Sequence, residues 1–116
     1  MMTDVVMTDV GTQEKRTIER ASVRWPVHAR ARQGLMPRAL ARDVSTRGVF
    51  VQVRDQRALP DRGQHLALRL FPSGAGGYLD LRGTVRWAGF SRRHHCWGVG
   101  IEYEIVAAAG ANPWAA

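Results

Sequence analysis

Cysteine and long apolar runs are scarce in this chain of 116 residues. Cys96 is the single cysteine, which excludes an internal disulfide and a zinc site built from several thiolates. No apolar run reaches the roughly 20 residues that a membrane helix needs, and the first residues lack the basic start and apolar stretch of a secretory signal. We therefore expect a soluble, cytoplasmic protein that makes no membrane contact.

Lysine is almost absent too, although the chain is basic. Of its 17 basic residues only Lys15 is a lysine, against 10 acidic residues. Residues 1–13 hold two acids and no base, so residues 14–116 carry a net charge of +9, from 17 basic and 8 acidic residues. The planar guanidinium of arginine suits phosphate oxygens and guanine edges, which predicts an anionic partner. Genome composition and solubility are the alternative explanation, and the positions of the arginines must decide between them.

No convincing helical segment of ten residues is present, and the apolar residues alternate with polar ones instead. This period of two marks six strands, near residues 23–32, 38–42, 49–53, 66–70, 79–87 and 97–103. Residues 33–37 form a turn, and Pro26 predicts a free edge or a bulge in the first strand. We expect an all-β fold of six antiparallel strands, which form a barrel or a sandwich.

The two ends of the chain differ from this pattern. We expect residues 1–13 to be a disordered N-terminal tail and residues 14–106 to form the barrel domain. Residues 107–116 are rich in alanine but interrupted by Gly110 and Pro113, so they form a tail or a short helix at most.

One candidate binding cluster lies where the tail meets the first strand. Arg16 and Arg20, separated by three residues, stand on a flexible lead-in that can fold over a ligand on the barrel. Each guanidinium offers paired donors to phosphate or to O6 and N7 of guanine. A solvated basic stretch is the alternative.

The second cluster is Asp43-x-Ser45-x-x-Gly48, within a bend between two strands. The carboxylate can accept hydrogen bonds from N1 and N2 of guanine, and the hydroxyl can bond a phosphate or an exocyclic amine. Gly48 permits close backbone approach or a positive φ. An ordinary Asx or Ser turn is the alternative, and we expect neither Arg20 nor Ser45 to lie on a core face.

Other chemistry is not supported by the residue pattern. His94, His95 and Cys96 are adjacent, so their side chains point in different directions and suit a solvated basic loop, together with Arg92 and Arg93, better than a metal site. No nucleophile elbow is present. We expect a protein that is not an enzyme and needs no metal or cofactor.

Both clusters together are more specific than either alone. With the strand from Val23 and the segments at 83–87 and 98–103, they resemble the PilZ domain family over about residues 14–104. That family is a six-stranded antiparallel barrel that binds the bacterial second messenger cyclic di-GMP, so the resemblance implies a Greek-key-like barrel and not a sandwich. The resemblance implies that Arg16 and Arg20 grip guanine edges and phosphates, while Asp43, Ser45 and Gly48 form the seat.

Two further residues take a role from the resemblance. Lys15 occupies a position that influences whether one cyclic di-GMP or an intercalated dimer is bound, and a basic residue there favours the dimer. Trp87 matches a place where some members stack an aromatic ring on a guanine. Its spacing from Leu79, Leu81 and Val85 fits a core role equally well.

Partners follow from what the chain encodes. The sequence holds one domain, so a cyclic di-GMP receptor would act through an effector protein that the sequence does not identify, or through a homodimer. Many family members carry a helix after the last strand, and its poor counterpart here leaves apolar surface that self-association could cover. The alternative function is a small basic barrel that binds RNA or single-stranded DNA, with Trp25 or Trp87 as stacking platforms.

Overall fold

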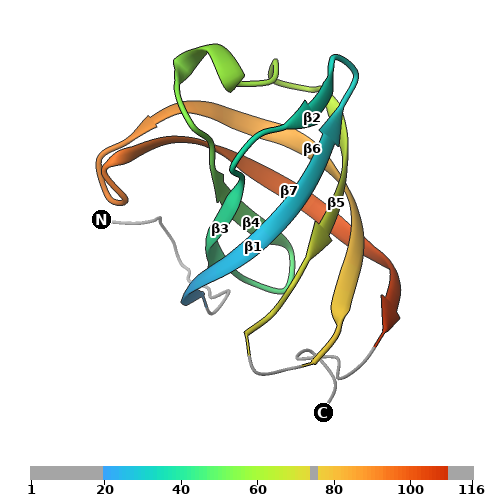
Figure 1. Ribbon diagram of the computed structural model, residues 1–116. Coiled ribbons are helices and arrows are strands. Elements are labelled where there is room, and N and C mark those ends of the chain that lie inside the picture. Colours follow the sequence, from blue (N-terminus) through green and yellow to red (C-terminus); the bar gives the residue numbers. More distant parts are fainter. Residues whose placement is uncertain (1–19, 74–75, 110–116) are drawn as a thin grey trace, which may run out of the picture.

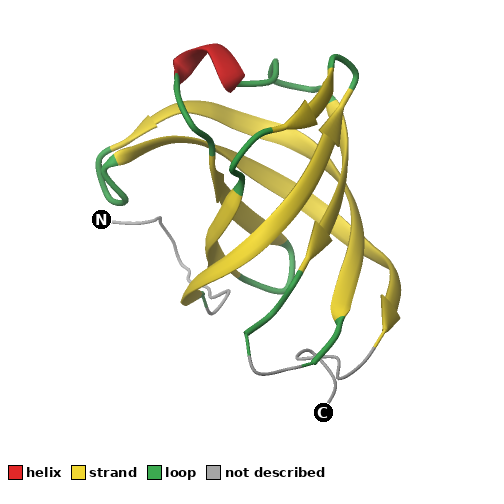
Figure 2. Ribbon diagram, viewed as in Figure 1, coloured by secondary structure: helices red, strands yellow, loops and turns green. Residues whose placement is uncertain are grey.

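The structure, a computed structural model that describes residues 20–73 and 76–109, is built from strands (Figure 2). Within these ranges there is no α-helix, and no helix long and apolar enough to cross a membrane. The elements are β1 (Ala21–Ala31), β2 (Gly34–Met36), β3 (Leu40–Val44), β4 (Gly48–Gln52), a 3₁₀ turn η1 (Gln56–Ala58), β5 (His65–Leu70), β6 (Tyr78–Ser91) and β7 (Cys96–Ala109).

Six of these strands close into a ring. The order is β1-β3-β4-β7-β6-β5, and β5 pairs with β1 to complete the barrel seen in Figure 1. Every ladder is antiparallel. The chain leaves β4 through η1 and reaches β5, which is not a neighbour of β4, so this connection crosses the barrel as in a Greek key. The predicted six-stranded antiparallel barrel is confirmed.

The barrel interior is filled by the apolar residues of the period-two pattern. In β1 the buried positions are Val27, Ala29 and Ala31, each separated by an exposed residue. Leu70 and Leu79 are direct cross-strand partners, and neither side chain reaches solvent. Burial of a leucine side chain stabilises the folded state by about 2 kcal/mol. Because pairing of the strands places both leucines inside the barrel, the strand ladder and the core stabilise each other.

The short strand β2 was not expected, because its residues lie in the predicted turn at 33–37. Gly34 pairs with Ala31 and Met36 pairs with Ala29, which makes β2 a hairpin extension of β1. Gly34 has a φ of 125°, a conformation that other residues rarely adopt. A strand of three residues is too short to display a period of two, so the turn prediction was wrong for Gly34–Met36.

β1 changes neighbours close to its proline. Its first half pairs with β3, with a register shift between Ser22 and Trp25, and its second half pairs with β5 from Val27 onward. The irregularity predicted from Pro26 therefore lies directly before that residue. The bulge lets one strand take part in both sides of the ring.

The last strand runs three residues beyond the expected domain end at 106, because Ala107–Ala109 pair with the start of β6. No helix begins there. The predicted tail at residues 1–13 and the end at 110–116 lie outside the described residues.

Candidate functional site

The bend between β3 and β4 is fixed by the hydroxyl of Ser45. Ser45 Oγ accepts hydrogen bonds from the amides of Gly48 (3.1 Å) and Arg47 (3.4 Å), and the Ser45 amide donates to the Gly48 carbonyl at 2.8 Å. Tyr103 donates its phenol O–H to the carbonyl of Ser45, and burial raises the pKa of this phenol to about 12. Ser45 is only 3% exposed, so the expectation that it lies away from the core was wrong. Its hydroxyl is used by the turn itself.

Gly48 ends this bend without a positive φ, because the glycines with positive φ in the described chain are Gly34, Gly63 and Gly76. A Cβ on Gly48 would lie 3.4 Å from the Ile101 carbonyl oxygen, an ordinary contact. The positive-φ explanation for this glycine was therefore wrong, and the barrel itself does not require a glycine here.

Asp43 is a buried carboxylate surrounded by basic side chains. It is 2% exposed, and its Oδ1 accepts a hydrogen bond of 3.1 Å from Nη1 of Arg20. Its Oδ2 lies 3.3 Å from His94 Nε2 and 3.8 Å from Arg93 Nη1. A buried carboxylate is costly unless charged and hydrogen-bonded partners compensate it; here the two arginines compensate its charge, and His94 lies within hydrogen-bond distance.

Arg20 brings the two predicted clusters together. It precedes β1, and its side chain remains 57% exposed although it contacts the buried Asp43. Ser22, two residues later, pairs with Asp43 across the β1–β3 ladder, and this register places Arg20 next to the bend. Arg16 and Lys15 lie outside the described residues.

His94 lies in the turn between β6 and β7 and is not the solvated loop residue that we expected. Its side chain is 11% exposed, and its ring stacks on Phe50 with centroids 4.7 Å apart and planes 17° apart. Burial lowers the pKa of His94; Asp43 opposes this shift, while Arg93 and Arg42 add to it. The ring is therefore neutral near pH 7, and Nε2 can donate to Asp43 only in the tautomer that carries its proton there.

An aromatic surface adjoins this cluster. Phe50 points outward from β4 and lies over Gly98 of β7, where any Cβ would collide with the phenyl ring. Trp87 lies 6.1 Å from Phe50 between ring centroids and is 44% exposed. A register shift in β6 between Val85 and Trp87 turns the indole outward, so the core alternative for Trp87 was wrong.

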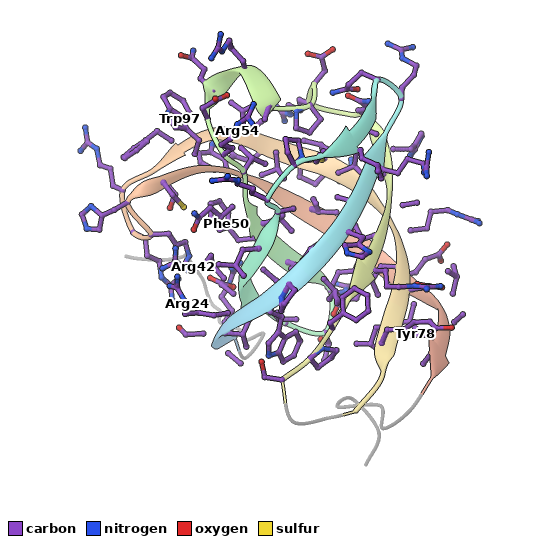
Figure 3. All side chains as sticks on the ribbon, viewed as in Figure 1. Arg24, Arg42, Phe50, Arg54, Tyr78 and Trp97 are labelled. Atoms are coloured by element: carbon purple, nitrogen blue, oxygen red, sulfur yellow. The ribbon has the colours of Figure 1, made fainter. Side chains whose placement is uncertain are left out.

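Sequence reasoning missed His94, Arg93 and Phe50 as neighbours of Asp43. Figure 3 shows Phe50, Arg42 and Arg24 on the same side of the barrel, with Tyr78 far from them. The pairing of Phe50 with both Asp43 and Gly100 explains the location of its ring. The sequence signal was the pair Gly98 and Gly100, which leaves room for a large side chain from a neighbouring strand.

Comparison with known proteins identifies the family. The family model of the PilZ domain matches residues 14–109. The chain belongs to the PilZ domain family. Domains of this family are non-enzymatic bacterial receptors for cyclic di-GMP, and the barrel with its Asp43 bend and adjacent Arg20 is this chain's version of that domain.

A solved structure has a similar fold. It is the inhibitor of motility MotI/DgrA of Bacillus subtilis, with a TM-score of 0.65 and 18% sequence identity. The alignment covers 81% of this PilZ chain and 45% of the solved chain, so the present chain spans less than half of that protein. No curated protein sequence matches the chain.

Proposed function

We propose that this PilZ domain binds cyclic di-GMP across Arg16, Arg20 and the bend from Asp43 to Gly48, and that capture of the ligand changes its conformation or its binding to an effector protein. The contact between Arg20 and Asp43 carries this proposal, since it joins two motifs that lie 23 residues apart. An acid and an arginine with an accessible guanidinium then face the same space, as recognition of a guanine nucleotide requires.

Asp43 favours a base over a phosphate as its ligand. A carboxylate repels a phosphate, whereas it accepts hydrogen bonds from N1 and N2 of guanine. Both of its oxygens already have basic neighbours, so a guanine would replace Arg20 at Oδ1 and release that guanidinium toward guanine edges or phosphates. This exchange would couple ligand capture to movement of the segment before β1.

Trp87 and Gly48 support the same site. The exposed indole next to Phe50 offers a face on which a guanine can stack. Because the barrel does not require a glycine at position 48, close approach of a ligand to the backbone is a reason for its presence. Lys15 would decide between one ligand and an intercalated dimer.

Self-association is a separate part of the proposal. Ile105 near the end of β7 is 40% exposed, and a homodimer would cover it. Light scattering over a wide concentration range tests it, and a monomer throughout would contradict it.

Calorimetric titration with cyclic di-GMP, alongside a single-stranded oligonucleotide, tests the main proposal. Arg20→Ala and Asp43→Ala should weaken cyclic di-GMP binding by about 10- to 100-fold, the cost of losing a guanine contact. Arg62→Ala is the matched control, because this exposed arginine lies in the turn before β5 and forms no ion pair within the described ranges. Salt-sensitive oligonucleotide binding without a dinucleotide signal would overturn the proposal.

A further inference from the structure

A groove of about 1150 Å³ lies on the barrel away from Asp43. Its walls come from β1, β2, the segment between β2 and β3, β5, β6 and the end of β7, at residues 26–30, 35–39, 67–69, 80–82 and 106. In the ring, β5 is three strands from β4, so the centre of the groove and the Asp43 bend lie on opposite sides. Both places can therefore be occupied at the same time.

Arginines surround an alanine in this groove. Ala67 pairs with Arg30 on one side and with Arg82 on the other, so the three side chains form one row across β1, β5 and β6. Two strand spacings separate the arginines by about 10 Å, and the small alanine leaves a hollow between them. Within residues 20–73 and 76–109, neither arginine forms an ion pair.

The remaining charges leave the groove positive. Arg38 also lines it and has no ion pair in the described part of the chain. Asp80 is the one acid among the lining residues, and Arg69 neutralises it through two hydrogen bonds of 2.7 and 2.9 Å. Glu104 of β7 is the cross-strand partner of Arg82 but forms no ion pair with it, so Arg30, Arg38 and Arg82 remain available to an anionic group.

Apolar side chains share the same groove. Leu35 is 67% exposed and Val106 is 49% exposed. We propose that this groove docks an acidic segment of a protein partner, whose carboxylates pair with Arg30, Arg38 and Arg82 and whose apolar side chains cover Leu35 and Val106. The proposal stands on the charge and exposure of these residues and does not depend on cyclic di-GMP binding.

Other occupants fit less well. No phenylalanine, tyrosine or tryptophan lines the groove, so bases of a single-stranded nucleic acid would find no such ring for stacking. A second copy of the chain would bring the same arginines and a net charge of +7. An acidic segment that also carries apolar side chains complements both the charge and the exposed leucine and valine.

The charge of Arg38 can be removed without straining the backbone. Its φ of 56° is a left-handed conformation that glycine adopts without strain. Arg38→Gly therefore removes the charge without a cost to the backbone. Arg30→Glu combined with Arg82→Glu reverses the charge on both sides of Ala67, and Arg62→Glu outside the groove is the matched control.

The test measures fluorescence anisotropy of a labelled peptide of about 12 residues with alternating Glu and Leu at about 0.15 M salt. The same peptide with Gln for Glu and a thymidine oligonucleotide are the comparison probes. The acidic peptide should bind about tenfold more tightly than either, and Arg38→Gly and the double variant should each weaken it by about tenfold. Arg62→Glu and Asp43→Ala should bind it as the parent does, and Asp43→Ala separates this result from the cyclic di-GMP site.

Three results would overturn the proposal. The first is equal binding of the acidic and neutral peptides, or an equal loss in Arg62→Glu. The second is tighter binding of the oligonucleotide, which would assign the groove to nucleic acid. The third is a concentration-dependent dimer that the double variant abolishes, which would assign the groove to a second copy.

Discussion

The two sides of this barrel differ in whether their charged side chains are buried or exposed. On the side of β3 and β4, Asp43 is buried and compensated by Arg20 and Arg93, and His94 lies within hydrogen-bond distance. On the side of β5, Arg30 and Arg82 are exposed around a small alanine. On the first side, here called the interlocked side, the charged groups are packed into the fold. On the second, the open side, they lie on an exposed surface.

This difference teaches that the number of arginines says little about function in an arginine-rich chain. A buried acid selects which arginine belongs to the proposed ligand site. On the open side, the shape of the groove and its exposed apolar residues indicate which arginines can bind a partner. Substitutions on the first side should therefore change both stability and ligand binding, whereas those on the second should change binding alone.

The largest expected effect is on the interlocked side, at Gly98. In Gly98→Ala the new Cβ would collide with the Phe50 ring and lie 2.6 Å from the Val51 carbonyl oxygen, so the ladder must shift. We expect a loss of about 2–3 kcal/mol and a thermal midpoint about 10 °C lower. Gly100→Ala is the control, because its Cβ would stand 3.7 Å from that of Trp87. Equal midpoints for the two variants would contradict the packing described here.

Ser45→Ala should have the next largest effect. It removes the acceptor that holds the amides of Arg47 and Gly48, and we expect about 1–2 kcal/mol of destabilisation without any ligand present. Urea denaturation measures this loss, with the exposed neighbour in Thr46→Ala as the control. If Ser45→Ala lost cyclic di-GMP binding at unchanged stability, the hydroxyl would serve the ligand and not the turn.

A smaller effect is expected from acidification, through His94. Its pKa in the folded protein is below 6.5, mainly because of burial, so the unfolded chain takes up a proton first as the pH falls. The stability from neutral His94 is complete above about pH 6.5 and is lost as the pH falls toward and through the folded pKa. Thermal midpoints at about pH 7.5 and 5.5 should differ less in His94→Gln than in the parent. The same difference in both proteins would show that other groups govern the response.

The smallest stability effect belongs to the open side, in Asp80→Asn. Arg69 lowers the pKa of Asp80 through their hydrogen bonds, yet both side chains are only partly buried, so loss of the pair should change the thermal midpoint little. The acidic peptide should bind more tightly to this variant, because the groove loses its negative charge. Weaker peptide binding would place the docking surface elsewhere.

The alternation of apolar residues was sufficient to predict the positions of all six strands in the ring, because each half-buried strand shows the period of two along its own sequence. The strand β2 was not predicted, because it is too short to show this period. The outward position of Trp87 was not predicted, because one bulge after Val85 reverses which residues face inward and local sequence does not reveal a bulge.

The candidate site was predictable where a motif carries it and hidden where only three-dimensional proximity does. Asp43, Ser45 and Arg20 were found through their spacing. His94 lies 51 residues from Asp43, and only the pairing of β4 with β7 brings them together. The hydrogen bond to the Ser45 carbonyl likewise comes from Tyr103, a residue of the last strand.

The divided pairing of β1 has a consequence for how the chain folds. Val27 pairs with Leu70 and Arg30 with Ala67, so the ladder that closes the ring joins residues far apart in sequence. Such contacts form only after the long chain segments between them have closed into loops, and barrels of this kind fold in milliseconds to seconds. Hydrogen exchange during refolding should therefore protect the local β6–β7 hairpin before the β1–β5 seam, and the groove would be the last surface of the barrel to form.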